Sequence, residues 1–167
     1  MELLIIRHAS AFKRDRLRWA DDALRPLSPA GIRRSRKAAA GIKALCKAPV
    51  RLLTSPLIRA AQTANILTEF AGWPRAKIAP ELEPGKGAAA VLALLAKDRC
   101  DRIAIVGHQP DLSELLTACL LRESKTLAIE LKKNAVACVS FHGRVRAGSG
   151  VINWLATPRL LRGFRDS

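Results

Sequence analysis

Apolar residues cluster in short runs along this chain, and segments with helical periodicity separate the runs. The apolar residues of Leu3–Ile6 and of Arg102–Val106 (RIAIV) predict two strands buried on both faces of a parallel sheet. Val50–Thr54 predicts a third strand, and Lys77–Ala79 a short fourth one. Strands of this kind need helices on both faces of their sheet.

Helical spacing of apolar residues predicts four helices, at residues 29–46, 56–71, 87–96 and 111–121. The first two follow Ser-Pro pairs, Ser28-Pro29 and Ser55-Pro56, in which serine is expected to cap the helix and proline to occupy its first turn. Such an alternation of strands and helices implies right-handed βαβ units.

The last third of the chain changes in character. Three strands are predicted there, at Leu127–Leu131, Ala135–His142 and Gly150–Leu155, with no room for helices between them. We therefore predict an α/β fold: a three-layer α/β/α sandwich whose central sheet is mostly parallel and has an antiparallel C-terminal edge. A single domain at 1–167 accounts for the whole sequence.

Charge is the unusual feature of the composition. The formal net charge is +15 and the pI about 10.9. The basic excess is concentrated in the first 50 residues, and a further basic group, Arg159, Arg162 and Arg165, stands near the end. A field of this sign attracts polyanions, acidic proteins or phosphorylated substrates, but it identifies none of them.

Cysteine usage and hydropathy point to the cytoplasm. Cys46, Cys100, Cys119 and Cys138 lack the spacing of a metal site or of a disulfide framework, and we expect them to be reduced. No apolar run resembles a signal peptide, and the longest, Ala88–Ala96, is about half the length of a membrane span. We expect no contact with membranes.

Unusual residues stand where three predicted strands end. Arg7 and His8 follow the first strand, Ser55 follows the second with Arg59 in the next helix, and His108 follows Arg102–Val106. Ligand sites of open α/β sheets lie beyond the carboxyl ends of the strands. Two imidazoles and two guanidinium groups are therefore expected to meet at one edge of the sheet.

Such a cluster suits phosphoryl transfer. Arginine binds the non-bridging oxygens of a phosphoryl group bidentately, and a neutral imidazole can attack phosphorus and form phosphohistidine. The helix after Ser55-Pro56 would direct amide dipoles at the same anion. Because the cluster has neither the carboxylates typical of magnesium sites nor a third imidazole for zinc, we expect chemistry without metal or cofactor.

The motifs resemble those of the histidine phosphatase superfamily: LLIIRHA at the start, RPLSPAG at 25–31, LLTSPLIRAAQTA at 52–64, the turn ELEPG, and VGHQP at 106–110. The resemblance implies that His8 is the phosphorylated nucleophile and that the phosphoryl group is held by Arg7, Arg59 and His108. Glu81 matches the general acid position. Ser10, Gln109 and Arg25 are candidates for substrate binding. Ala9 departs from the usual glycine.

The loop at 10–27 leaves two alternatives open. Asp21 and Asp22 are the second candidates for the general acid. Trp19 either stacks on a substrate or fixes the loop to the core, and we favour the second role. His142, away from the strand-end cluster, is expected to be structural or solvated.

The short chain lacks the insertions that enclose small substrates in mutases and acid phosphatases, and it resembles the SixA-type branch. That branch acts on phosphohistidine in proteins, which is our favoured substrate. Small phosphate esters or phosphorylated metabolites are the alternative. A binding module for a polyanion such as polyphosphate is the second alternative, and nucleic acid is disfavoured because no aromatic residues interleave with the basic ones.

Overall fold

The sheet at the centre of the protein has six strands in the order β3-β2-β4-β1-β5-β6. The structure is a computed structural model that describes residues 1–122 and 127–164, so that Arg165 of the C-terminal basic group lies outside the described residues. The strands are β1 (Glu2–Arg7), β2 (Arg51–Thr54), β3 (Lys77–Ile78), β4 (Arg102–Gly107), β5 (Val136–Phe141) and β6 (Gly150–Ala156).

Strand directions follow the predicted pattern. β1 and β2 both pair in parallel with β4, and β3 pairs in parallel with β2. β5 is antiparallel to β1, and β6 is antiparallel to β5. The prediction of a mostly parallel sheet with an antiparallel C-terminal edge is therefore confirmed.

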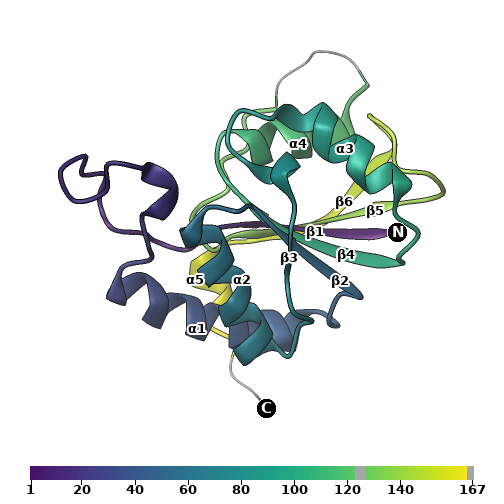
Figure 1. The fold of residues 1–167 in the computed structure, drawn as a ribbon. Helices are drawn as coiled ribbons and strands as arrows, with labels where there is room; N and C mark the ends of the chain where they lie inside the picture. The colour runs from purple at the N-terminus through teal and green to yellow at the C-terminus, as the bar shows by residue number, and fades with distance from the viewer. Residues whose placement is uncertain (123–126, 165–167) are drawn as a thin grey trace.

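Helices cover both faces of the sheet (Figure 1). One face carries α1 (Pro29–Leu45), α2 (Ile58–Ala71) and α5 (Pro158–Leu161), and the other carries α3 (Gly87–Lys97) and α4 (Asp111–Leu120). Successive residues of a strand face opposite sides, so Leu4 and Ile6 join the first core and Leu3 and Ile5 the second. This confirms the three-layer sandwich.

The loop at 10–27 projects from the sandwich beside the carboxyl end of β1 (Figure 1). It contains a short 3₁₀ helix, η1 (Asp22–Leu24), and an isolated bridge between Ala11 and Leu27 joins its two ends. Trp19 packs on Phe12 of the same loop, with ring centroids 5.3 Å apart, and the Arg18 guanidinium covers both rings. Trp19 thus stabilises the loop internally, and the predicted attachment to the core is wrong.

Leu127–Leu131 is not a strand, contrary to the prediction. β5 already has partners on both sides, so the sheet offers this segment no edge there. Side chains bind its carbonyl groups instead: the Ser113 hydroxyl donates to the Ile129 oxygen over 2.5 Å and Arg7 donates to the Leu131 oxygen over 2.7 Å. An alternation of apolar and polar residues alone does not distinguish such an anchored irregular segment from a strand.

The second Ser-Pro pair also behaves differently from the prediction. α2 begins at Ile58 with Leu57 as its cap residue, two positions later than expected. Ser55 is fully buried, and its hydroxyl lies 2.9 Å from Nε2 of His108. Its side chain thus belongs to the strand-end cluster.

Candidate active site

The carboxyl ends of β1, β2 and β4 lie side by side, and the residues that follow them are held in register by the backbone. The N–H of His8 donates to the Gly107 oxygen over 3.1 Å, and the N–H of Ser55 donates to the Val106 oxygen over 3.0 Å. The two imidazoles that leave β1 and β4 consequently face each other, with centroids of His8 and His108 5.0 Å apart and planes inclined by 50°.

His8 is neutral and has a defined tautomer. Its Nδ1 lies 2.7 Å from the carbonyl oxygen of Ala9. A carbonyl oxygen only accepts, so Nδ1 carries the proton and the lone pair resides on Nε2. Burial lowers the pKa of His8 to about 4, against the opposing effect of the Ala9 carbonyl, and Arg59, Arg7 and Lys133 lower it further. At neutral pH Nε2 is therefore an available nucleophile.

His108 is also neutral. Burial is the main cause that lowers its pKa to about 3, with His8 and Arg59 contributing. Nε2 of His108 lies 2.9 Å from Ser55 Oγ, which also accepts the N–H of Leu57 over 3.3 Å. When the serine donates its proton to Nε2, Nδ1 carries the proton of the ring. It is buried and has no hydrogen-bond partner among the described residues.

Arg59 stands in the first turn of α2 and is 5 % exposed. Its Nη1 donates to the Asp22 carbonyl oxygen over 2.8 Å and lies 3.2 Å from the Asp22 carboxylate. Burial lowers the pKa of Arg59, and Asp22 opposes this shift. The contact joins the 10–27 loop to the helix that begins beside the two histidines.

Arg7 is the last residue of β1. Its Nη1 donates to the Leu131 carbonyl oxygen, while its Nε is buried without a partner in the described chain. The Nε of Arg59 is likewise buried and has no hydrogen-bond partner in the described chain. Arg7, Arg59 and His108 thus contribute three of the five buried side-chain nitrogen or oxygen atoms that lack a partner within 1–122 and 127–164. An uncompensated buried donor is costly, and a phosphoryl oxygen would satisfy it.

Thr63 was not singled out by the sequence. Its hydroxyl donates to the Arg59 carbonyl over 2.7 Å and accepts the N–H of Ala9 over 3.0 Å. It therefore joins α2 to the backbone that fixes the tautomer of His8. Ala9 itself is fully buried. The sequence offers one signal for this role, the position of Thr63 one helical turn after Arg59 within LLTSPLIRAAQTA.

The three candidates for substrate binding lie in different settings. Ser10 lines a cavity together with Arg7, and its carbonyl approaches α1 so closely that a Cβ on Gly31 would lie 1.9 Å from the oxygen. Gln109 is turned towards α4, where its amide binds the Ser113 hydroxyl over 2.6 Å. Arg25 donates to the Asp22 carboxylate over 2.8 Å and to the Phe12 carbonyl over 2.7 Å. Arg25 thereby braces the loop.

The candidate acids differ in their partners. Asp22 binds Arg25 and Arg59, and the Arg25 hydrogen bond is the first cause that holds the pKa of Asp22 below its usual range, so it is a poor proton donor. Asp21 accepts the N–H of Ala23 at the start of η1. Glu81 lies in the 3₁₀ helix η2 (Pro80–Leu82), half-buried, and its side chain makes no hydrogen bond or ion pair with the described residues. Of the three candidate acids, Glu81 is the one whose carboxyl group makes neither an ion pair nor a hydrogen bond with the described residues.

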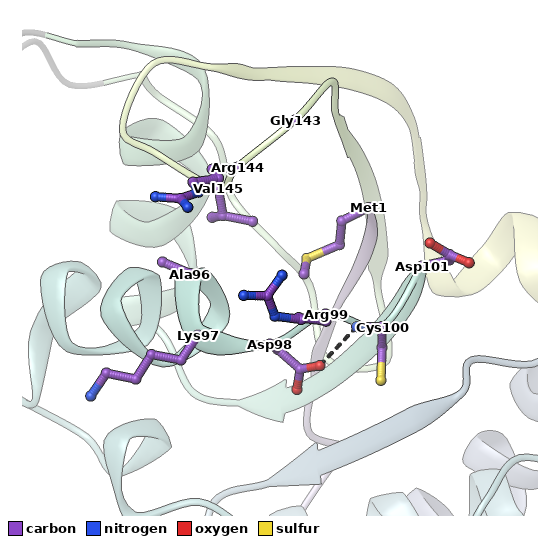
Figure 2. Close-up of a pocket in the computed structure, with 10 residues that line it drawn as sticks. All are labelled: Met1, Ala96, Lys97, Asp98, Arg99, Cys100, Asp101, Gly143, Arg144 and Val145. Carbon is purple, nitrogen blue, oxygen red and sulfur yellow. Dashed lines mark hydrogen bonds between the residues drawn. The ribbon is translucent and has the colours of Figure 1, made fainter.

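The opposite end of the sheet has a different character. Exposed His142 follows β5 there, away from His8, as predicted. A pocket of about 410 Å³ at that end contains Lys97, Asp98 and Arg144 (Figure 2). Its carboxylates and cations alternate, and none of its lining residues is a histidine.

The described part of the chain has neither a cluster of metal ligands nor a helix that could span a membrane. Within 1–122 and 127–164, no three histidine, cysteine, aspartate or glutamate side chains are grouped to hold a metal ion. Over the same part of the chain, every helix is too short or too polar to cross a membrane.

Known proteins resemble this chain in sequence. The family described as histidine phosphatase superfamily (branch 1) matches residues 3–83. An uncharacterized protein of Picosynechococcus sp. is 38% identical over 117 residues, which cover 68% of this chain and 70% of that protein. The phosphohistidine phosphatase SixA of Escherichia coli (strain K12) is 28% identical over 162 residues, 95% of this chain and 94% of that protein.

Solved structures agree with these matches. The protein histidine phosphatase SixA complexed with tungstate superposes with a TM-score of 0.81 and 28% identity, over 95% of this chain and 98% of that one. A SixA-like protein from Agrobacterium tumefaciens, at 18% identity and a TM-score of 0.77 over 94% and 97% of the two chains, shares the fold. The chain therefore belongs to the histidine phosphatase superfamily, and it is a phosphatase that resembles SixA in both sequence and structure.

Proposed function

We propose that the protein hydrolyses phosphohistidine on proteins through a covalent phosphohistidine intermediate on Nε2 of His8. The observation that supports this most directly is the neutral imidazole of His8 beside three buried N–H donors, on Arg7, Arg59 and His108, that lack partners in the described chain. A neutral nucleophile surrounded by donors suits an anionic electrophile.

The reaction has two displacements. In the first, the Nε2 lone pair of His8 forms a bond to phosphorus while the bond from phosphorus to the leaving atom breaks, and that atom keeps the electron pair and takes a proton. In the second, a water oxygen attacks phosphorus, the bond to Nε2 breaks, and a water proton goes to solvent. Inorganic phosphate leaves. Arg7, Arg59 and His108 stabilise charge on the non-bridging oxygens in both steps.

Phosphohistidine as the substrate is supported by two observations. The chain resembles SixA over nearly its whole length. In addition, two of the three candidate acids, Asp21 and Asp22, are already engaged by hydrogen bonds or ion pairs, and a leaving imidazole needs less help from an acid than an alkoxide does. Tungstate, which the solved SixA structure contains, is a tetrahedral oxyanion like phosphate.

The test compares three substrates in the presence of a metal chelator: a protein phosphorylated on histidine, an aryl phosphate and inorganic polyphosphate. We expect the first to give the highest kcat/KM, and His8→Ala to abolish release of phosphate. His142→Ala is the matched control, because it removes an exposed imidazole at the opposite end of the sheet. Quenching during turnover should trap an acid-labile, base-stable phosphoenzyme in the His142→Ala protein and none in His8→Ala.

Other results would redirect the proposal. Faster turnover of the aryl phosphate would favour small phosphate esters as substrates. Activity that persists in His8→Ala would contradict the covalent mechanism, and binding of polyphosphate without turnover would favour a polyanion-binding module. A cytoplasmic location remains a prediction, to be checked by cell fractionation.

A further inference from the structure

A basic hollow adjoins the phosphoryl site on the side of β5. It has a volume of about 420 Å³, and its charged lining consists of Arg7, Arg34, Lys132, Lys133 and Arg162 with the single carboxylate of Glu130. These side chains come from the end of β1, from α1, from the turn before β5 and from the residue after α5. Four parts of the chain that are distant in sequence therefore bring cations to one place.

The turn that carries the two lysines is rigidly held. Leu131 is fully buried, and its carbonyl accepts the Arg7 guanidinium over 2.7 Å. Asn134, buried and with a φ of 67°, donates its N–H to the Arg7 carbonyl over 3.1 Å and accepts the Ser35 hydroxyl over 3.1 Å. Because both flanking residues are fixed in the interior, Lys132 and Lys133 are presented outward at a defined position.

The hollow is electrostatically continuous with the phosphoryl site. Arg7 lines it and directly precedes His8. Lys133 lies near enough to help lower the pKa of His8. Burial, followed by the charges of Arg7 and Arg25, lowers the pKa of Lys133. Like charges gathered in this way repel one another, and an anion between them removes that cost.

Few carboxylates of the protein itself neutralise the cations of the hollow. Glu130 is the one acid in the lining, and within the described chain no carboxylate lies in ion-pair distance of Arg34, Lys132, Lys133 or Arg162. By contrast, Asp22 compensates Arg59 and Arg25 nearby. The phosphoryl site and the hollow are thus two adjacent positions that can bind an anion, and the hollow carries the greater net positive charge.

We propose that this hollow binds a second anionic group of the substrate, a carboxylate or a phosphate, while the scissile phosphoryl group lies at His8. The inference rests on the proposed phosphatase function and specifies its substrate class: molecules that carry another negative charge close to the phosphoryl group. A volume of about 420 Å³ admits such a group with the atoms that connect it, since small-ligand pockets span roughly 300–1,000 Å³.

The experiment compares substrates that differ in this second charge alone. One series consists of phosphohistidine peptides with aspartate or asparagine at each flanking position in turn. The other pairs a sugar monophosphate with its bisphosphate. In each series the ratio of kcat/KM for the anionic member to that for its neutral partner reports on the subsite, and the series with the larger ratio identifies whether the anion comes from a peptide or from a small molecule.

Arg34→Gln and Lys132→Gln remove exposed charges of the hollow, and Arg144→Gln is the matched control in the pocket of Figure 2. We expect each hollow variant to lower the ratio about three- to fivefold, as expected for one solvent-accessible ionic contact at the strong end of its range. Arg144→Gln should leave it unchanged. Circular dichroism would verify that the variants are folded.

A wild-type ratio near one in both series, or an equal decline in Arg144→Gln, would overturn the subsite and leave general electrostatic attraction as the explanation. Failure of the proposed function looks different. In that case wild-type protein turns over none of the phosphorylated substrates, or His8→Ala retains activity, and no ratio can be attributed to the hollow.

Discussion

The backbone N–H of Ala9 donates to the hydroxyl of Thr63 over 3.0 Å, across 54 positions of sequence. The carbonyl of the same alanine accepts Nδ1–H of His8 over 2.7 Å. Thr63 and His8 therefore bind the two backbone polar groups of Ala9, and the threonine hydroxyl in turn donates to the Arg59 carbonyl. A helix residue that was not among the predicted site residues consequently helps to orient the imidazole of His8.

Thr63→Val should disturb that orientation. Valine keeps the volume but leaves the buried N–H of Ala9 without an acceptor, which costs about 1–3 kcal/mol in the free energy of unfolding. We expect a decrease in kcat with little change in KM, because the imidazole loses its alignment while the phosphoryl donors remain. Urea unfolding and steady-state kinetics measure both effects.

Thr68→Val is the matched control for this change. Thr68 lies on the same helix and its hydroxyl approaches the carbonyls of Ala64 and Pro74 at 3.2 and 3.0 Å, remote from the strand ends. The Thr68→Val protein should be less stable than wild type, but its kcat per folded molecule should be unchanged. Equal kinetic effects of the two substitutions would contradict a positioning role for Thr63.

The tautomer of His8 is open to direct observation. The contact with the Ala9 carbonyl predicts a protonated Nδ1 and a bare Nε2 at pH 7. Spectra of protein labelled with ¹⁵N-histidine distinguish the two nitrogen types, and His8→Gln assigns the signals. A protonated Nε2 in the free enzyme would exclude that nitrogen as the attacking atom without prior rearrangement.

The sequence predicted the strand-end cluster because strand periodicity and the residues after each strand are local properties. The apolar runs before His8 and His108 give the parallel strands, and parallel strands end at one edge. Lys133 and Thr63 are different, since their relation to the site arises from long-range contacts. The strand prediction for Leu127–Leu131 was wrong because burial of one face produces the same alternation of apolar and polar residues in an irregular segment as in a strand.

Replacement of Arg59 by lysine should show that the guanidinium acts by its geometry. Lysine keeps the charge but lacks the planar guanidinium, in which Nη1 binds Asp22 while Nε stays free for a phosphoryl oxygen. The loss of a charge-assisted hydrogen bond, about 1.5–3 kcal/mol, corresponds to roughly a 10- to 150-fold weaker competitive inhibition by inorganic phosphate. Arg51→Lys, which alters the Arg51–Asp98 ion pair at the other end of β2, should leave the inhibition constant unchanged.

Glu81→Gln tests proton donation to the leaving group. If Glu81 is the acid, the loss of kcat should grow with the basicity of the leaving group: about 10²–10⁴-fold for an alkyl phosphate and much less for phosphohistidine or an aryl phosphate with an acidic phenol. Glu83→Gln, in the same turn, should show no such trend. A uniform decrease across leaving groups would assign Glu81 to substrate binding.

The two buried imidazoles should also make stability depend on pH. Their pKa values, about 4 for His8 and about 3 for His108 in the folded protein, lie below the ordinary value near 6.5. The unfolded chain therefore binds more protons as the pH falls below 6.5, and the stability that is complete above this value is lost progressively down to the folded pKa values. At roughly 1.4 kcal/mol per pKa unit, His8 alone contributes about 3 kcal/mol to this loss.

Urea unfolding of wild type, His8→Gln and the exposed His142→Gln between about pH 7.5 and 4.5 measures this loss of stability. A shallower pH dependence is expected in His8→Gln only, and identical slopes in all three proteins would mean that His8 has the same pKa in the folded as in the unfolded chain.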